Sequence, residues 1–319
     1  MQAMVQHKYG NADVLAIEEI ARPTVGDDEV LIRVQAASLN PFDWHEMTAK
    51  PFLMRFGTGL FKPKRSVLGV DVAGRVEAIG PTVTRFEPGD EVFGWCRGAY
   101  AQYARVRETQ LLPRPMSLSP EQAAAVPIAG FTALQGLRDR GRIAEGDRVL
   151  IIGASGGVGT FAVQIAKAFG AEVTGVCSSR NADLVRSLGA DYVVDYTQED
   201  ITKGQNRYDL IFQLAGTVSP AKLLRILTPT GTLVLSSGEG RLSGLDRIVK
   251  AYARAPFVSQ RMVTWVANNS LDDLATLTEL FESGKVTPVI DKSFDLSEGA
   301  AAMRYLEAGH TRGKVVITP

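Results

Sequence analysis

The first third of the chain alternates hydrophobic and polar residues in short stretches that are separated by Gly and Pro. Residues 29–37 (EVLIRVQAA) place Val30, Ile32 and Val34 at every second position, which predicts a strand packed on one face. Similar strand-forming patterns occur at residues 70–79, 91–94 and 100–106. Many short strands with turn residues between them predict a small β-barrel domain.

From about residue 121 the chain changes to longer units, in which strands alternate with helices. Strands are predicted at residues 149–152, 172–176, 192–194, 210–212 and 232–235, and helices at 158–169, 181–188 and around 221–227. This alternation indicates an α/β domain with a parallel, doubly wound sheet, because parallel neighbours are joined by crossover helices.

The C-terminal part predicts a return to the first domain. Residues 271–282 and 296–308 have the pattern of amphipathic helices, and residues 314–317 have that of a closing strand. We therefore divide the chain into a barrel-like domain at 1–122, an α/β domain at 123–268 and a returning segment at 269–319.

Two further segments bear on assembly. Residues 239–261 are rich in Arg and Lys, and we interpret them as an insertion over a cleft or at a subunit contact. Residues 262–266 (MVTWV) predict an edge strand that can pair with its copy across a two-fold axis. We expect a homodimer, with a monomer as the alternative.

Composition excludes several classes of function. The chain has 319 residues, and its 35 basic residues balance its 35 acidic ones, so no overall positive charge favours binding to nucleic acid. Its two cysteines, Cys96 and Cys177, are too few for a disulfide framework and fit a reducing compartment. No window approaches the roughly 20 apolar residues of a membrane span, and the start lacks a leader pattern. We expect a soluble cytoplasmic protein without a nucleic-acid or membrane partner.

A glycine-rich segment, GASGGVG at residues 153–159, links a predicted strand directly to a predicted helix. This is the context of a Rossmann turn in the form AxGxxG, with Ala154 in place of the usual first glycine. Gly156 would let the backbone approach a pyrophosphate, Gly159 would let helix and strand pack closely, and the helix N-terminus would supply free N–H groups. The candidate residues for binding a dinucleotide are Ser155, Gly156, Gly157, Val158 and Gly159.

The end of the second strand of this domain indicates which dinucleotide is bound. NAD-preferring enzymes place an Asp or Glu there to accept hydrogen bonds from the ribose 2′-hydroxyl. This chain has Ser178, Ser179 and Arg180 instead, which are suited to a 2′-phosphate. These residues therefore favour NADPH over NADH, and the alternative is that Ser179 and Arg180 only cap and solvate the next helix.

Motifs along the whole chain resemble the medium-chain dehydrogenase/reductase superfamily, and within it the zinc-independent quinone oxidoreductase and enoyl reductase branch. The motifs are NPFD at 40–43, GVDVAG at 69–74, PGDEVFG at 88–94, GFTA at 130–133, the AxGxxG loop, LGAD at 188–191 and GKVVI at 313–317. The resemblance implies a GroES-like barrel built from both ends of the chain around a central Rossmann domain. It also implies an active site between the two domains.

The resemblance also bears on metal binding. Alcohol dehydrogenases of the superfamily hold catalytic zinc with Cys, His and Cys ligands, and the matching places here hold Asn40, Val70 and about Ala129. A catalytic zinc site needs about three protein ligands, so we expect no metal site. Without a metal to polarise an alcohol, the reaction that we expect is hydride transfer from NADPH to a quinone or an α,β-unsaturated carbonyl compound.

The resemblance suggests catalytic candidates near the nicotinamide. Asn40 and Thr132 match polar positions that hold the ring or bond the substrate oxygen, and His45 is a candidate proton donor. Asp43 and Asp71 are more readily structural residues that are tied to neighbouring groups. Further candidate cofactor contacts follow the later strands; these residues are Leu214, Ala215, Gly216, Ser236, Ser237 and Lys314.

Two other functions remain open at this point. One is an alcohol or aldehyde reductase, which would need a hydrogen-bond donor in place of zinc. The other is a protein that binds NADPH without catalysis. The presence of Asn40 and Thr132 together with the AxGxxG loop favours the enzyme.

Overall fold

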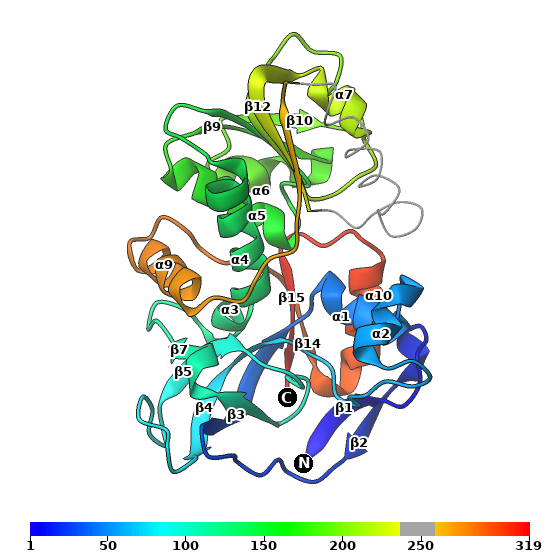
Figure 1. The fold of residues 1–319 in the computed structure, drawn as a ribbon, viewed down its shortest axis with the longest axis vertical. Helices are drawn as coiled ribbons and strands as arrows, with labels where there is room; N and C mark the ends of the chain where they lie inside the picture. The colour runs from blue at the N-terminus through cyan, green and yellow to red at the C-terminus, as the bar shows by residue number, and fades with distance from the viewer. Residues whose placement is uncertain (237–258) are drawn as a thin grey trace. The chain divides into compact units, whose positions relative to one another are not determined.

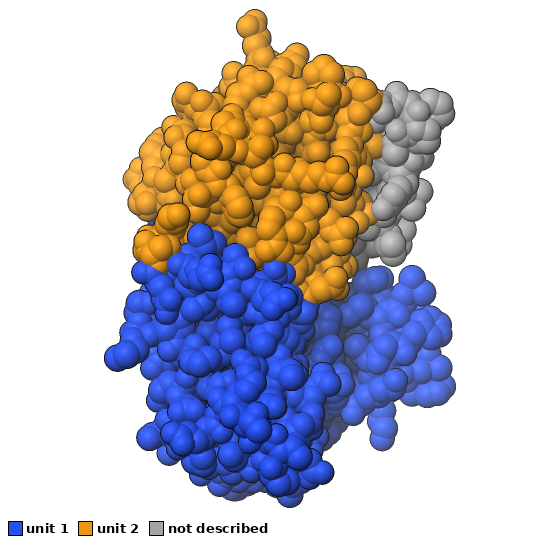
Figure 2. Space-filling model, turned by 60° about the vertical axis from the view of Figure 1, so that its left-hand side comes forward, with its two compact units in different colours: residues 1–129, 269–282, 288–319 blue, residues 130–268, 283–287 orange. Residues whose placement is uncertain are grey.

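The computed structural model of the protein describes residues 1–236 and 259–319. These residues form two compact units, which are drawn in different colours in Figure 2. Unit 1 comprises residues 1–129, 269–282 and 288–319, and unit 2 comprises residues 130–268 and 283–287. Both ends of the chain therefore belong to unit 1. Most of the predicted insertion at 239–261 lies outside the described residues.

Unit 1 is built on a seven-stranded sheet and a two-stranded one. The strands are β1 (Gln2–Gln6), β2 (Leu15–Glu19), β3 (Glu29–Ser38), β4 (Asp71–Ile79), β5 (Glu91–Trp95), β6 (Tyr103–Arg107), β7 (Leu111–Pro113), β14 (Ile290–Asp295) and β15 (Lys314–Thr318). The larger sheet runs in the order β14-β15-β3-β4-β5-β7, and β6 also pairs with β3. Strand β15 pairs with the end of β3, whereas β6 pairs with its first half, so two strands share one edge of β3.

Short helices connect these strands. They are η1 (Ala12–Val14), α1 (Pro41–Thr48), η2 (Phe52–Met54), α2 (Arg55–Thr58), η3 (Glu108–Gln110), α3 (Pro120–Ala124), α9 (Leu271–Glu282), η8 (Leu296–Glu298) and α10 (Gly299–Glu307). Helix α4 (Pro127–Gln135) begins in unit 1 and continues into unit 2.

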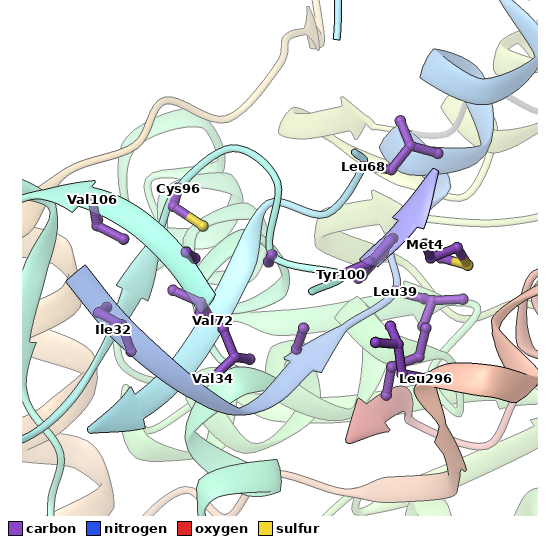
Figure 3. Close-up of a cluster of buried hydrophobic side chains, with 14 of the residues drawn as sticks. Met4, Ile32, Val34, Leu39, Leu68, Val72, Cys96, Tyr100, Val106 and Leu296 are labelled. Carbon is purple, nitrogen blue, oxygen red and sulfur yellow. The ribbon is translucent and has the colours of Figure 1, made fainter. Parts of the chain in front are cut away.

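Buried residues of the unit 1 strands form its core. Val30, Ile32 and Val34 of β3 are almost completely buried, as predicted, but Leu31 between them is buried as well, so this strand is not packed on one face alone. Figure 3 shows Ile32 and Val34 in one cluster with Val72, together with Tyr100. Each fully buried aliphatic side chain of this kind contributes roughly 1.5–3 kcal/mol relative to exposure, so the cluster fixes the register of the strands that carry the polar residues described below.

Unit 2 contains a six-stranded parallel sheet. Its strands are β8 (Arg148–Ile152), β9 (Glu172–Cys177), β10 (Tyr192–Asp195), β11 (Tyr208–Gln213), β12 (Leu227–Leu235) and β13 (Arg261–Thr264), in the order β10-β9-β8-β11-β12-β13. The chain moves outward from β8 through β9 to β10 and then returns to the other side of β8 with β11. The order of strands therefore reverses between β8 and β11, which is where ligands bind in sheets of this kind.

The helices of unit 2 lie in the connections between its parallel strands, which run in both directions along the sheet from β8. They are the π-helix η4 (Gly136–Gly141), α5 (Gly157–Ala168), η5 (Ser179–Asn181), α6 (Ala182–Ser187) and α7 (Pro220–Leu224). Helices α5 and α6 lie on one side of the sheet and α7 lies on the other (Figure 1). The alternation of strand and helix along the chain is confirmed.

Some predicted boundaries are wrong. The predicted helix around residues 221–227 ends at Leu224, and Leu227 already belongs to β12. The helical periodicity of this short apolar stretch does not distinguish the end of a helix from the start of a buried strand. The predicted strand at 100–106 begins only at Tyr103, because Tyr100 is packed in the core before the strand starts. Within the described residues, no helix is long and apolar enough to span a membrane.

Candidate active site

The loop between β8 and α5 in unit 2 is shaped to present backbone N–H groups. The N–H groups of Gly153 and Ala154 both bond to the carbonyl of Val176 on β9, which turns the chain at the end of β8. Helix α5 then begins at Gly157, with Gly156 as its N-cap. The first N–H groups of a helix have no partner within it, so Gly157, Val158 and Gly159 supply donors at the positive end of the helix dipole. This arrangement fits a pyrophosphate.

The two glycines of the loop are required for different reasons. A Cβ on Gly159 would lie 2.0 Å from the carbonyl oxygen of Gly153 and 2.7 Å from the carbonyl carbon of Ala154. Contacts this short cannot exist, so Gly159 allows the start of α5 to pack against the loop. A Cβ on Gly156 would meet only the Gly153 oxygen, at 3.5 Å. Gly156 is therefore not needed for packing inside the protein, which fits the open approach that a bound phosphate requires.

Ser155 connects this loop to the segment after β9. Its hydroxyl accepts a hydrogen bond from the side-chain nitrogen of Asn181 at 2.9 Å, and both side chains are buried. Sequence reasoning missed Asn181 because it treated this residue as the first residue of the helix predicted at 181–188. The bond fixes the AxGxxG loop relative to η5, which carries two of the candidate residues for a 2′-phosphate.

The segment after β9 exposes Ser179 and Arg180, while Ser178 is half-buried. A carboxylate that sequence reasoning did not consider lies beside them. Asp195 ends β10 and pairs in register with Cys177 of β9, and the Ser179 hydroxyl, followed by Thr197, lowers the pKa of Asp195. Asp195 belongs to the third strand, so a rule that examines only the end of the second strand cannot find it.

The loops after β8 and β11 contact each other at the point where the strand order of the sheet reverses. The N–H of Leu214 bonds to the carbonyl of Ile152 at 2.9 Å, and a Cβ on Gly153 would lie 2.7 Å from that of Ala215. Gly216 has a positive φ of 78° and open space around it. The predicted residues from the AxGxxG loop and from 214–216 are thus brought together in unit 2.

The next strand places Ser236 beside the same loops. The N–H of Ser236 bonds to the carbonyl of Gln213 at 3.1 Å, at the end of β11. Ser237 lies outside the described residues.

The candidate catalytic residue Asn40 lies in unit 1, between β3 and α1, and only 2% of it is exposed. Its side-chain oxygen accepts a hydrogen bond from the Lys314 ammonium at 2.6 Å, and its side-chain nitrogen donates to Asp71 at 2.8 Å. Both ends of the amide are thus held inside the unit. Sequence reasoning had placed Asn40 and Lys314 near the cofactor as separate contacts, and the structure joins them directly.

Lys314 is buried and its ammonium makes several internal contacts. It donates to the carbonyl of Leu39 at 3.1 Å and lies 3.7 Å from the Asp71 carboxylate. Burial lowers the pKa of Lys314, and the nearby carboxylates of Asp71 and Asp43 oppose this shift. Two of the three N–H groups of the ammonium are thus donated to Asn40 and Leu39, and a contact of Lys314 with the cofactor stays a prediction.

Asp43 is a second buried carboxylate in this part of unit 1. It accepts a hydrogen bond from the backbone N–H of Asn40 at 2.8 Å, at the start of α1. Burial raises the pKa of Asp43 to about 7, although the Tyr100 hydroxyl and the Asn40 N–H favour its ionised form. Asp43 therefore holds its proton up to near-neutral pH.

His45 and Thr132, the other two catalytic candidates, belong to different units. Nδ1 of His45 lies 2.6 Å from the carbonyl of Lys50, so this nitrogen carries a hydrogen and donates. In the neutral ring Nε2 is then an acceptor, and it can give up a proton only from the imidazolium form. Thr132 is half-buried on α4 in unit 2.

The places that hold zinc in related alcohol dehydrogenases contain few ligand groups. In residues 1–236 and 259–319, no three His, Cys, Asp or Glu side chains come together in a way that could hold a metal ion. Burial raises the pKa of the Cys96 thiol well above its ordinary value, and that of Cys177 is also raised. Both thiols are therefore protonated near neutral pH.

Two family models match parts of the chain. Residues 26–116 match the model of the alcohol dehydrogenase GroES-like domain, and residues 188–317 match that of the zinc-binding dehydrogenase family. The first match lies in unit 1. The second covers the later strands of unit 2 and the returning C-terminal segment.

Three similar proteins cover the whole chain. The chain is 34% identical to an NADPH-dependent alkenal/one oxidoreductase of Arabidopsis thaliana, over all of its own length and 80% of that protein. It is 33% identical to a 2-methylene-furan-3-one reductase of Solanum lycopersicum, over all of its length and 79% of that protein. The solved quinone oxidoreductase of Coxiella burnetii has 29% identity and a TM-score of 0.88, with 100% of this chain and 99% of that one covered. The chain therefore belongs to the medium-chain dehydrogenase/reductase superfamily, in its quinone oxidoreductase branch.

Proposed function

We propose that this chain is an NADPH-dependent oxidoreductase that reduces quinones or α,β-unsaturated carbonyl compounds. The observation that carries the proposal is the AxGxxG loop, in which Gly159 closes the packing and Gly156 leaves the approach open. This loop lies where the strand order reverses, in a chain similar over its full length to an NADPH-dependent alkenal/one oxidoreductase.

The residues of unit 2 fit the parts of this dinucleotide. The N–H groups at the start of α5 would hold the pyrophosphate, and Ser178, Ser179 and Arg180 would hold the 2′-phosphate. The loop at 214–216 and Ser236 border the same edge of the sheet and would contact the remaining part of the cofactor. We also propose Ser237, the next residue in the sequence, as a cofactor contact.

NADPH supplies a hydride to the substrate when it is bound. In an enal or enone the hydride adds to the β-carbon, the electron pair of the double bond moves toward the carbonyl oxygen, and the α-carbon then takes a proton. A quinone similarly takes one hydride and one proton to become a hydroquinone. The protein has to orient the substrate, exclude water and stabilise the developing oxyanion.

We assign Thr132, Asn40 and His45 to the part of the site that handles the substrate. The Thr132 hydroxyl would bond the substrate oxygen or the nicotinamide. His45 is the proposed proton donor, through Nε2 of its imidazolium form, because Nδ1 is held by the carbonyl of Lys50. Asn40 shapes the site by holding the start of α1, since its amide is bonded to Lys314 and Asp71.

We also propose that the reaction needs no zinc, although one matching family model is named for zinc binding. The support is that the three places that match zinc ligands hold Asn40, Val70 and about Ala129 instead. Turnover that is unchanged by a strong chelator, and not increased by added Zn²⁺, is the expected result. Loss of turnover in the chelator that returns with Zn²⁺ would contradict this part of the proposal.

We propose a homodimer formed through the outer edge of β13, and a cytoplasmic location. Strand β13 ends the sheet and pairs only with β12 among the described strands, so its other edge is available for a second copy. The buried thiols of Cys96 and Cys177 suit a reducing compartment.

The proposed function is tested by following NADPH oxidation with a quinone, an enone, an enal and a saturated aldehyde. Turnover of the quinone or the enone, with NADPH preferred over NADH, is expected. Turnover of the saturated aldehyde alone would indicate an aldehyde reductase instead. NADPH binding without any turnover would indicate a binding protein.

The cofactor preference has its own test in Arg180→Gln. A charge-assisted hydrogen bond contributes about 1.5–3 kcal/mol, so KM for NADPH should rise about 10-fold or more while KM for NADH stays nearly constant. Arg186→Gln is the matched control, because Arg186 is exposed and forms an ion pair with Asp183 within the same helix. Equal effects of Arg180→Gln on both cofactors would show that Arg180 does not recognise the 2′-phosphate.

A further inference from the structure

A buried hydrogen-bond network in unit 1 is centred on the Asp71 carboxylate. One oxygen accepts hydrogen bonds from the Ser38 hydroxyl at 2.9 Å and the Asn40 side chain at 2.8 Å, and it lies 3.7 Å from the Lys314 ammonium. The other oxygen accepts the backbone N–H of Ile128 at 3.2 Å. Because Lys314 also donates to Asn40, we call these five residues the Asp71 network.

The register of the sheet brings these residues together. Ser38 pairs directly with Asp71 across β3 and β4, and with Val316 across β3 and β15. If the register of β15 and β3 is continued by two residues, Lys314 lies opposite Asn40. Strand β15 is the last strand of the chain, so the network joins residues that are more than 270 positions apart, as the Lys314–Asn40 bond shows.

The segments that the Asp71 network ties together are those that carry zinc ligands in related alcohol dehydrogenases. The three ligand places here are Asn40, Val70 and about Ala129. The network contains Asn40 itself, the residue after Val70 and the residue before Ala129. The same three loops are thus joined around a carboxylate and an ammonium.

The network is also well suited to hold these loops rigidly. Asp71 is fully buried and only 3% of Lys314 is exposed, so neither charge is screened by water. A buried pair of this kind is stable only when its remaining hydrogen-bonding groups are also satisfied, and both oxygens of Asp71 have partners here. The Ile128 N–H that Asp71 accepts lies at the start of α4, where the helix dipole favours a nearby negative charge.

We propose that the Asp71 network positions the start of α1 and the start of α4 for the reaction. Asp71 and Lys314 are then positioning residues, which fix the start of α1 through Asn40 and the start of α4 through Ile128. Helix α4 also carries Thr132, one turn further on. The consequence for activity rests on the proposed reductase function, whereas the fixing of the two loops does not.

The experiment compares the wild type with Lys314→Met, Asp71→Asn and the double variant Asp71→Asn/Lys314→Met. Either single variant leaves one buried charge without its partner and should lower Tm strongly. The double variant removes both charges at nearly constant volume and should recover most of Tm. Its kcat should nevertheless stay at least 10-fold below wild type, with Kd for NADPH within about 3-fold, because small displacements of reacting groups cost up to about 100-fold in rate.

Arg22→Met is the matched control for loss of a cation in unit 1. Arg22 forms an ion pair with Glu77 at 2.8 Å, but both side chains are about 40% exposed (42% and 38%). Arg22 also lies 3.8 Å from the centroid of the Tyr103 ring. Exposed contacts of these two kinds contribute about 1 kcal/mol or less each, so Tm should fall only slightly and kcat should stay close to wild type.

Hydrogen exchange provides a readout that does not depend on turnover. In the double variant the amides of Asn40 and Ile128 should exchange at least 10-fold faster than in wild type, whereas those of β8 and β11 should not change. If the wild type reduces no quinone or enone, the proposed function fails, and this measurement still decides whether the network fixes the loops.

Two results would overturn the inference. One is a double variant with wild-type kcat and wild-type exchange at Asn40 and Ile128, which would make the network dispensable. The other is a large rise in Kd for NADPH at unchanged kcat in Lys314→Met, which would make Lys314 a direct cofactor contact.

Discussion

At the scale of single residues, two glycines of the same loop should respond differently to one added methyl group. Gly159→Ala should lower Tm, because its Cβ would lie 2.0 Å from a backbone oxygen that cannot move away freely. Gly156→Ala should keep Tm within experimental error, because its φ of −82° suits any residue and the nearest atom is 3.5 Å away. Thermal denaturation without ligand measures both effects.

For cofactor binding we expect the opposite order, with the larger effect in Gly156→Ala. Gly156→Ala should weaken NADPH binding by 10-fold or more, since the methyl group would stand where the backbone must approach the pyrophosphate. Titration of the folded variant with NADPH measures this. Unchanged NADPH affinity in Gly156→Ala would place the pyrophosphate elsewhere.

Asp43 should make stability depend on pH. Its pKa is about 7 in the folded chain and near 3.8 when it is unfolded, so the folded state binds the proton more tightly. Between about pH 4 and pH 7 the unfolded chain has already lost this proton, and the Asp43 contribution to the free energy of unfolding therefore falls as pH rises. Above pH 7 the contribution is constant.

Asp43→Asn tests this expectation, because the amide oxygen can still accept the N–H of Asn40 while no proton is exchanged. Denaturant unfolding at pH 5 and at pH 8 should show a smaller loss of stability in the variant than in the wild type. An equal loss in both proteins would mean that Asp43 titrates normally.

At the scale of elements, helix α9 shows which segments are predictable from their own sequence. The structure has this helix at Leu271–Glu282, with the same boundaries as the predicted one. Its buried positions include Leu274, Leu277 and Phe281, which recur at helical spacing. By contrast, α7 is only five residues long and its end is set by the start of β12, so periodicity gives no clear boundary there.

Leu277→Ala should therefore lower the free energy of unfolding by about 2–5 kcal/mol, as expected for a large-to-small change at a fully buried position. Glu282→Ala at the exposed end of α9 is the control, with an expected effect within about 0.5 kcal/mol. Urea unfolding distinguishes the two. A loss below 1 kcal/mol for Leu277→Ala would show that α9 does not stabilise unit 1.

At the scale of the whole molecule, the edge strand β13 should decide the oligomeric state. Val266 follows this strand and is 85% exposed, so we expect it to lie in the interface of a dimer formed through β13. Light scattering after size exclusion should give a dimer for the wild type and a monomer for Val266→Lys. The variant should keep its NADPH affinity, because Val266 lies outside the proposed cofactor contacts. A wild-type monomer, or a dimer that persists in Val266→Lys, would exclude this interface.

The sequence alone determined those features that depend on local pattern. Strand β3, the alternation in unit 2 and the AxGxxG loop follow from periodicity and from the special conformations of glycine, which act over a few residues. The absence of zinc-ligand residue types at Asn40, Val70 and Ala129 was equally visible. The family and the expected chemistry could therefore be predicted before any coordinates.

The tertiary structure decided which polar groups meet. The sequence suggested Lys314 as a cofactor contact, and only the pairing of β15 with β3 shows that its ammonium also meets Asn40, with Asp71 close to both. Asn181 reaches Ser155, and Asp195 reaches Ser179, from neighbouring strands of the sheet. These contacts depend on strand register and on burial, which arise only when distant segments pack together, and the pKa of Asp43 is raised for the same reason.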